Sequence, residues 1–380
     1  MYKVAVIKCN SYDYEELTGS IKRGIELVGG LSSLFTSTEN ILIKPNILVG
    51  DKPEKSVTTH PSLLAALSDI LLSENHILCY GDSPAIGSLK RAAEKSGIKK
   101  AFDERDVKAA DFETIVNVPF PKGRMLKNLP LAKGVLSADS IISVSKMKTH
   151  EFTRITGAVK NQFGCIPGLL KGEFHVKMPD IVDFCKVLYD INLYLSPKLF
   201  IMDGITAMEG NGPRSGDSIN MNTILFSTDP VALDMTFCKL IDLNPEFVPS
   251  IGLYPESGNG NISFKDIEFV GDPISELINK NFIVKRKPFD RLITAKSFPP
   301  FLKNLISPKP QINYQTCKNC GKCVLQCPTE PKSVNWDKES KFNFPVYDYK
   351  SCIRCYCCQE ICPHNSISIK TPFLGKLIRR

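Results

Sequence analysis

The sequence predicts an α/β protein in which a mainly parallel, doubly wound sheet is followed by a small α+β domain. Over residues 1–278, short apolar stretches typical of strands alternate with longer stretches of helical periodicity. Polar segments follow several of the strands, as they do in open parallel sheets. Two cysteine runs of equal spacing then occupy residues 311–372. A chain of 380 residues is long enough for two or three such domains.

Strand and helix patterns alternate from the first residues onward. An early helical pattern ends at Gly29 and Gly30, and a later one opens at Pro61, where the first turn needs no N–H donor. We expect strands at residues 2–9, 40–48, 76–80, 115–118, 140–145 and 198–202. We expect helices at residues 15–31, 59–72, 88–96, 180–195 and 230–241.

Composition narrows the classes of protein. Hydrophobic residues make up 43% and charged residues 23% of the chain, which is typical of a globular protein. There is no run of 18 apolar residues that predicts a membrane span, and the first residues lack the plan of a signal peptide. Fourteen cysteines, with no pairing pattern outside the two runs, favour a reducing, cytoplasmic location.

The net charge of +8 is unevenly spread. Residues 1–278 carry 29 basic and 34 acidic side chains, whereas residues 279–309 carry eight basic and one acidic. We interpret the proline-rich segment 279–310 as a basic linker with one short helix around residues 291–296. Its charge favours docking on the acidic first domain or on an acidic redox partner. No nucleic-acid-binding module is recognisable, so we expect no nucleic acid; attachment to a membrane surface is an alternative that the prolines disfavour.

Five polar clusters from separate segments sit where strands end. Because the carboxyl ends of parallel strands meet at one edge of a sheet, we expect these side chains to surround a ligand there. The lysines favour an anionic small molecule, and the aspartates suit acid–base roles. The ligand-binding candidates are Lys44, Asn46, Asp82, Ser83, Lys160 and Asn161. The catalytic candidates are Lys146, Lys148, His150 and Asp203. Each cluster taken alone is also ordinary turn chemistry.

The segment 156–168 is rich in glycine, which lets the backbone approach a ligand closely. It contains a spare thiol, Cys165. The sequence has neither a dinucleotide fingerprint nor a phosphate-binding G-x-x-x-x-G-K-[ST] loop. The glycine-rich residues 209–216 are either a lid or a surface turn. Asp229 is either a functional carboxylate or the N-cap of the helix that Pro230 begins.

Five motifs together carry a family resemblance. They are Lys-Pro-Asn at 44–46, Gly-Asp-Ser-Pro at 81–84, Ser-Lys-Met-Lys-Thr-His at 145–150, Thr-Gly-Ala-Val-Lys-Asn at 156–161 and Asp-Pro-Val-Ala-Leu-Asp at 229–234. Over about residues 1–275 the chain resembles the DUF362 domain family, some members of which carry a ferredoxin module behind this domain. The resemblance implies an α/β domain and no particular substrate or reaction.

Each cysteine run has the spacing C-x-x-C-x-x-C-x-x-x-C-P. Three thiolates at this spacing wrap three corners of one iron–sulfur cluster, and the fourth reaches to the other cluster. One 4Fe-4S cluster is then held by Cys317, Cys320, Cys323 and Cys362. The other is held by Cys352, Cys355, Cys358 and Cys327. Zinc sites or disulfides fit less well, because zinc needs only four ligands and disulfides need an oxidising compartment.

Over about residues 312–370 the chain resembles the two-cluster bacterial ferredoxins. We therefore assign a ferredoxin-like two-cluster domain to residues 311–372 and a basic tail to residues 373–380. The 24 residues between the runs include Trp336 and predict a longer hairpin than usual. Cys357, beside the ligand Cys358, is a bystander or an alternative ligand.

Two functions remain open from the sequence. In the first, the protein is a ferredoxin-type oxidoreductase that passes electrons between a redox partner protein and an anionic ligand in the α/β domain. In the second, it is a non-catalytic electron carrier or an assembly protein whose α/β domain docks a partner. We expect the cluster domain to fold back on the lysine-rich edge, with Phe289, Phe298 and Phe301 as anchors.

Overall fold

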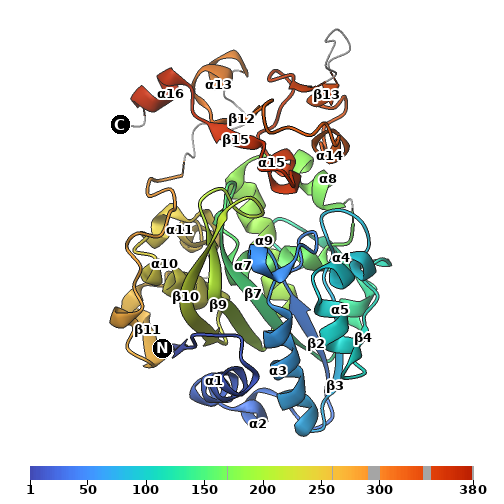
Figure 1. Ribbon diagram of the computed structural model, residues 1–380, viewed down its shortest axis with the longest axis vertical. Coiled ribbons are helices and arrows are strands. Elements are labelled where there is room, and N and C mark those ends of the chain that lie inside the picture. The colour runs from blue at the N-terminus through green and yellow to red at the C-terminus, as the bar shows by residue number, and fades with distance from the viewer. Residues whose placement is uncertain (169, 259, 290–299, 337–343, 379–380) are drawn as a thin grey trace.

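Nine strands form one mixed, mainly parallel sheet in the computed structural model, which describes residues 1–168, 170–258, 260–289, 300–336 and 344–378 (Figure 1). The strands are β1 (Tyr2–Lys8), β2 (Asn40–Pro45), β3 (Ile77–Tyr80), β4 (Lys108–Ala109), β7 (Ser140–His150), β8 (Arg154–Ile155), β9 (Leu199–Glu209), β10 (Asp217–Ser227) and β11 (Ile267–Gly271). Their order is β11-β1-β10-β9-β7-β2-β3-β4, and β8 pairs with β7. The predicted α/β class is confirmed.

The sheet is parallel through its larger half. Strands β9, β7, β2, β3 and β4 run in one direction, and β11 is parallel to β1. Strand β10 is antiparallel to both of its neighbours, β1 and β9. Strand β7 is buried along all 11 of its residues, as expected of a strand that is covered on both faces.

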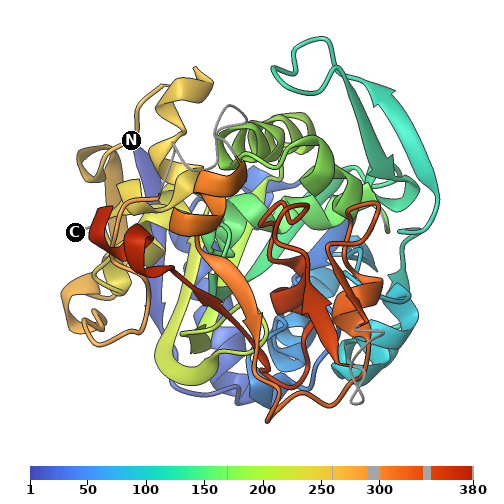
Figure 2. The same ribbon diagram turned by 90° about the horizontal axis from the view of Figure 1, so that it is seen from above.

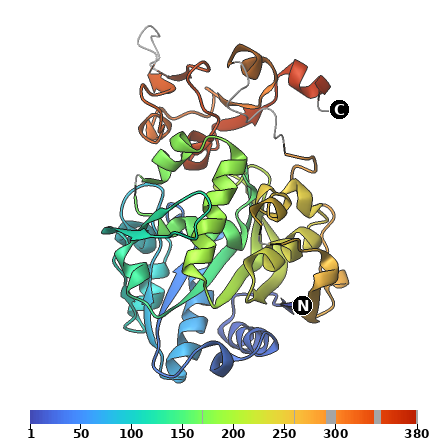
Figure 3. The same cartoon turned by 180° about the vertical axis from the view of Figure 1, so that it is seen from behind.

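Helices cover both faces of the sheet (Figure 1, Figure 3). One group comprises α1 (Tyr14–Leu27), α3 (Pro61–Ser73), α4 (Leu89–Lys95) and α5 (Ile98–Asp103). The other comprises α7 (Gly157–Asn161), α9 (Ile181–Leu195), α10 (Pro230–Leu240) and α11 (Pro249–Gly252). Shorter helices are α2 (Leu31–Leu34), α6 (Lys133–Leu136) and α8 (Leu170–Lys177). Asp13 caps α1 and Asp229 caps α10, each by accepting two backbone N–H groups, so the capping interpretation of Asp229 is the correct one.

The structure differs from the predicted elements in several places. The strand expected at 115–118 is β5 (Ile115–Pro119), which pairs with β6 (Asn128–Ala132) in a hairpin outside the main sheet. Strands β7 and β9 each run several residues past their predicted ends. Some polar residues that were expected to follow these strands therefore lie within them. Strands β4, β8, β10 and β11 of the main sheet have no counterpart among the predicted strands. The helix expected at 291–296 lies outside the described residues.

The C-terminal part of the chain is a small α+β unit. Strand β12 (Lys309–Ile312) pairs with β15 (Ile367–Lys370), and β13 (Val334–Trp336) pairs with β14 (Pro345–Tyr347). The second pair confirms the hairpin predicted between the cysteine runs. The helices of this C-terminal unit are α13 (Pro300–Ile306), α14 (Lys322–Leu325), α15 (Cys357–Ile361) and α16 (Phe373–Ile378).

This unit, residues 300–378, lies over the carboxyl edge of the parallel strands and is called the cluster module below (Figure 1, Figure 2). The turn that joins β9 to β10 contacts α15. Arg214 donates to the carbonyl of Ile361, and Gln359 Nε2 donates to the carbonyls of Asn211 and Gly212 at 3.1 Å each. The segment 209–216 is therefore a docking turn rather than a free lid.

Part of the predicted linker packs on the first domain. Phe282 is fully buried, Phe289 packs against the same core, and Lys285 pairs with Glu151. This contact agrees with the expected attraction between the basic linker and the acidic first domain. Phe298 lies outside the described residues, as does the side chain of Phe301. Among the described helices, none has both the length and the apolarity needed to cross a lipid bilayer.

Candidate functional site

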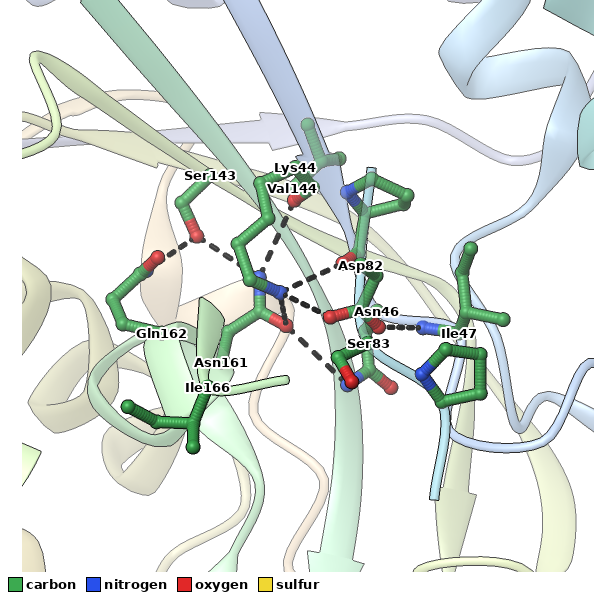
Figure 4. Close-up of polar contacts among 12 residues, drawn as sticks. Lys44, Asn46, Ile47, Asp82, Ser83, Ser143, Val144, Asn161, Gln162 and Ile166 are labelled. Atoms are coloured by element: carbon green, nitrogen blue, oxygen red, sulfur yellow. Dashed lines mark hydrogen bonds and ion pairs between the residues drawn. The ribbon is translucent and has the colours of Figure 1, made fainter. Parts of the chain in front are cut away.

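Lys44 and Asp82 form a buried ion pair at the carboxyl edge of the sheet. Lys44 ends β2, Asp82 follows β3, and Lys44 Nζ donates to Asp82 Oδ1 at 2.8 Å and to Asn161 Oδ1 at 3.3 Å (Figure 4). The second carboxylate oxygen accepts the backbone N–H of Ile47 at 2.8 Å. Asn161 also donates to Ser143 Oγ at 2.9 Å. The pair is thus closed by hydrogen bonds on each side.

Two glycines of the segment 156–168 lie directly against buried carboxylates. A Cβ on Gly164 would lie 1.9 Å from Asp82 Oδ1, and a Cβ on Gly157 would lie 2.3 Å from Asp234 Oδ1. Asp234 accepts the N–H groups of Ala158 and Val159 at the start of α7, and burial raises its pKa to about 7. The expected close approach of backbone to a ligand is therefore, at these two positions, an approach to carboxylates of the chain itself.

A second buried pair lies further along the same edge. Lys146 Nζ donates to Asp203 Oδ2 at 2.8 Å. Asp203 also accepts from the Tyr12 hydroxyl at 2.7 Å and from the backbone N–H of His60 at 2.9 Å. The imidazole of His60 stacks on the ring of Tyr12. Lys146 and Asp203 thus satisfy each other and do not line the cavity described next.

A cavity of about 80 Å³ lies between the sheet edge and the cluster module. The α/β domain contributes the side chains of Asn46, Asp82, Ser83, Thr156, Lys160, Asn161, Lys171 and His175, and the module contributes Gln326, Cys357, Glu360 and Ile361. Several buried polar atoms on this lining have no hydrogen-bond partner among the described residues. They are Asn46 Oδ1, Thr156 Oγ1 and His175 Nδ1. A cavity of this size with unpaired polar atoms suits a small polar ligand.

Three lysines give the cavity a cationic character. Burial and the nearby Lys160 lower the pKa of Lys148 to about 7, and its Nζ donates to the carbonyl of Val57 at 2.6 Å. Burial also lowers the pKa of Lys171 to about 7, and its Nζ donates to Ser83 Oγ at 2.7 Å. Burial lowers the pKa of Lys160 as well. An anion beside these groups would stabilise their charged forms.

Glu360 of the cluster module meets these cations. His150 Nε2 lies 2.9 Å from Glu360 Oε1, while His150 Nδ1 accepts two backbone N–H groups. Burial lowers the pKa of His150 to about 4 and that of His175 to about 4. Burial alone would raise the pKa of Glu360, but His150 and Lys160 lower it to about 2. Glu360 therefore stays a carboxylate, held beside His150 and Lys160.

The structure separates the sequence-predicted residues into two sets. Asn46, Asp82, Ser83, Lys160 and Asn161 line the cavity. The others are buried and do not line it, namely Lys44, Lys146, Lys148, His150 and Asp203. Sequence reasoning missed Thr156, Lys171, His175 and Glu360. The first three stand inside or just after the glycine-rich segment, which was a usable signal, whereas Glu360 depends on the docking of the module.

Cys165, the spare thiol of the glycine-rich segment, is buried. Burial raises its pKa to about 12, so the sulfur stays protonated and is a poor nucleophile.

The first predicted set of cluster ligands gathers around one space. Cys317, Cys320, Cys323 and Cys362 line the same cavity of about 20 Å³, together with Ile312 and Pro345. Three ligands from one run and the fourth from the other therefore meet, as the bacterial spacing requires. Within the described residues, no three Cys, His, Asp or Glu side chains are drawn in to the spacing of a single metal ion. A four-iron cluster holds its thiolates further apart than one ion does, so the thiols fit a cluster.

The second set is less tightly gathered. Cys327 and Cys358 lie in one small buried cluster of side chains in the module, and Cys352 and Cys355 lie close enough to Cys358 to influence its thiol electrostatically. Cys357 lines the cavity beside Glu360, and its thiol interacts with that of Cys355 in this group.

Two family models match separate parts of the chain. The family DUF362, a domain of unknown function, matches residues 41–239, and a 4Fe-4S dicluster domain matches residues 309–363. The thylakoid-associated protein sll1697 of Synechocystis sp. is 30% identical over 262 residues, which are 67% of this chain and 79% of that protein. The C-terminal part is thus an iron–sulfur cluster-binding domain.

Two solved structures show a weaker likeness. The lactate racemase apoprotein of Thermoanaerobacterium thermosaccharolyticum is 15% identical with a TM-score of 0.40, over 63% of this chain and 56% of that one. A Thermotoga maritima protein is 14% identical with a TM-score of 0.33, over 53% and 52%. The chain spans about half of the length of each. The DUF362 match, by contrast, covers more than half of the present chain, which belongs to the DUF362 family.

Proposed function

We propose that this protein carries two 4Fe-4S clusters and passes electrons between an outside redox partner and a small anionic ligand in the cavity between its two parts. The ligands of the clusters are the two cysteine sets given above. When bound, the clusters supply single electrons. A reducing compartment such as the cytoplasm suits these thiols, all fourteen of which are free of disulfides.

One observation carries the proposal: the roof of the cavity is built from immediate neighbours of the second set of ligands. Gln326 precedes Cys327, Cys357 precedes Cys358, and both Gln326 and Cys357 line the cavity. Lys160 faces them from the α/β domain. A ligand held there would lie next to the second cluster, while the exposed Cys320 leaves the first cluster open to a partner.

The charge of the lining supports an anionic ligand. Four lysines, Lys44, Lys148, Lys160 and Lys171, lie in or directly behind the cavity wall, against two carboxylates, Asp82 and Glu360. The ammonium of Lys44 is engaged by Asp82. Lys160 makes no hydrogen bond or ion pair with the described residues and is the group best placed to contact the ligand. Its ammonium would stabilise the negative charge that an added electron brings to the ligand.

The test uses the full chain, prepared without oxygen, and a Lys160→Gln variant. Eight irons and eight acid-labile sulfides are expected in both proteins, since two cubanes need them. Inorganic phosphate or malonate should alter the magnetic resonance spectrum of the reduced protein. The variant should bind these anions at least tenfold more weakly, because one charge-assisted hydrogen bond contributes about 1.5–3 kcal/mol.

Lys177→Gln is the matched control, because Lys177 is an exposed lysine of the neighbouring α8, with 66% of its side chain accessible. This variant should bind the anions as the parent does. Four irons, or zinc, would contradict the two-cluster part of the proposal. Equal binding by all three proteins would contradict the ligand part.

The alternative, an electron carrier whose α/β domain is only a scaffold, also has an observation in its favour. The two ion pairs Lys44–Asp82 and Lys146–Asp203 are closed by internal hydrogen bonds and need no ligand. Two clusters without any anion-dependent spectral change would favour this second function.

A further inference from the structure

Helices α13 and α16 form an apolar face at one end of the cluster module, away from the sheet (Figure 1). Five large apolar side chains on these helices are exposed to solvent. They are Leu302 (37% exposed), Leu305 (47%), Phe373 (74%), Leu374 (47%) and Leu377 (49%). Single exposed apolar residues are ordinary, but a group of them on two adjoining helices indicates a binding surface. We call these five residues the α13–α16 face.

The segment that carries α16 is basic. Residues 361–380 contain four lysines or arginines and no acidic residue. The basic residues include Lys370, at the end of β15, and Lys376, within α16. Exposed leucine and phenylalanine beside lysine and arginine are the composition of helices that lie in the interface of an anionic membrane.

We propose that the α13–α16 face docks on the surface of an anionic lipid bilayer. Its apolar side chains enter the boundary between headgroups and acyl chains, and the flanking lysines attract the anionic headgroups. The face projects from two short helices rather than forming a groove, which suits a fluid lipid surface better than a shaped protein partner. The proposal does not depend on the reaction proposed above.

The position of the face keeps the redox surface free. Figure 1 shows α13 and α16 at one end of the module and α14 at the other, and the cysteines that precede α14 include the exposed Cys320. A protein bound to lipid through the α13–α16 face therefore presents the first cysteine run to a soluble partner. An acidic partner protein is the competing occupant of the face, and the experiment separates the two.

The experiment is flotation of the full, cluster-loaded chain with vesicles. Vesicles of equal parts phosphatidylcholine and phosphatidylglycerol should carry the protein upward at low salt, and vesicles of phosphatidylcholine alone should not. Raised ionic strength should weaken the binding, because the attraction to headgroups is screened. The double variant Phe373→Ser/Leu377→Ser should lower the apparent affinity about tenfold or more, since it removes two apolar side chains from the buried contact.

A second double variant, Ile77→Ser/Leu193→Ser, is the matched control. It removes two exposed apolar residues of the α/β domain, 60% and 52% accessible, and should bind vesicles as the parent does. Equal iron content in all three proteins excludes misfolding of the module as the cause. Parent protein that ignores anionic vesicles, or Phe373→Ser/Leu377→Ser that binds them as well as the parent, would overturn the proposal and leave the face to a protein partner.

Discussion

Replacing Arg214 by methionine should loosen the cluster module from the α/β domain without unfolding either part. The buried guanidinium bonds Asp51 at 2.6 and 3.1 Å and also donates to the carbonyl of Ile361 in α15. Only the last bond joins the two parts. Asp51 keeps a partner in the variant, since Lys95 Nζ lies 2.7 Å from Oδ1. The loss should therefore fall mainly on docking.

The magnitude follows from the kind of bond that is lost. A hydrogen bond to a charged group contributes about 1.5–3 kcal/mol, and each 1.4 kcal/mol is a factor of ten, so the ratio of docked to released module should fall by about 10- to 150-fold. The bonds from Gln359 and Ser215 remain and limit the effect. Amide hydrogen exchange measures the change, because the backbone of α15 and of residues 209–216 should lose protection together.

Arg23→Met is the matched control for this variant. Arg23 forms a comparable pair with Asp272 at 2.9 Å, but its side chain is 49% exposed and far from the module in sequence and in space. It should leave the exchange of α15 unchanged. If Arg214→Met also leaves it unchanged at equal iron content, the module is held by other contacts and the reasoning is wrong.

Three further predictions follow from buried groups. Lys44→Met should destabilise the folded chain by about 3–5 kcal/mol because it leaves the Asp82 carboxylate buried without its cation. Adding Asp82→Leu should recover much of that loss in a thermal melt, and a single variant that melts like the parent would contradict the assignment. Tyr347→Phe should lower the reduction potential of one cluster only, since the Tyr347 hydroxyl donates to Cys358 Sγ at 3.2 Å; a redox titration followed by magnetic resonance that finds both potentials unmoved would refute it. Burial lowers the pKa of His60 to about 4, below its ordinary 6.5, so below pH 6.5 the unfolded chain takes up a proton that the folded chain does not. The free energy of unfolding should therefore fall by up to about 3 kcal/mol as the pH drops from 6.5 to 4. The difference in melting between the parent and His60→Asn, measured from pH 7 to pH 5, should shrink accordingly, and a constant difference would exclude the effect.

Much of the fold was predictable because its signals are local. The aspartate before Pro230 predicts the start of a helix there, and the apolar run at Asn40–Pro45 predicts a buried strand. Strand β10 was harder because its pairing with β9 shifts register between Asn220 and Thr223, so no regular alternation marks it. The sequence did not show that β5 pairs with β6 outside the main sheet, since a five-residue strand pattern does not specify the partner strand.

The candidate site was predictable where it depends on strand order and not where it depends on docking. Lys44 lies at the end of β2 and Asp82 just after the neighbouring parallel strand β3, so their meeting follows from the topology. The topology does not decide which lysine lines the cavity. Lys148 donates to the backbone carbonyl of Val57, whereas Lys160 makes no such bond within the described part of the chain and lines the cavity. Glu360 enters the site only because α15 rests on the turn after β9, and no local pattern specifies that contact.

The paired strands β9 and β10 carry that turn, so their length sets the distance between the sheet and the cluster module. A strand rises about 3.3 Å per residue, so adding two residues to each would lift the turn by about 7 Å. An even number keeps every side chain on its own face of the ribbon. Paired insertions or deletions of two residues in β9 and β10 would then give a graded series of proteins with identical chemistry and different gaps between the cysteine-rich roof and the lysine-lined floor. Such a series would show how steeply the rate of electron transfer between the two parts depends on distance.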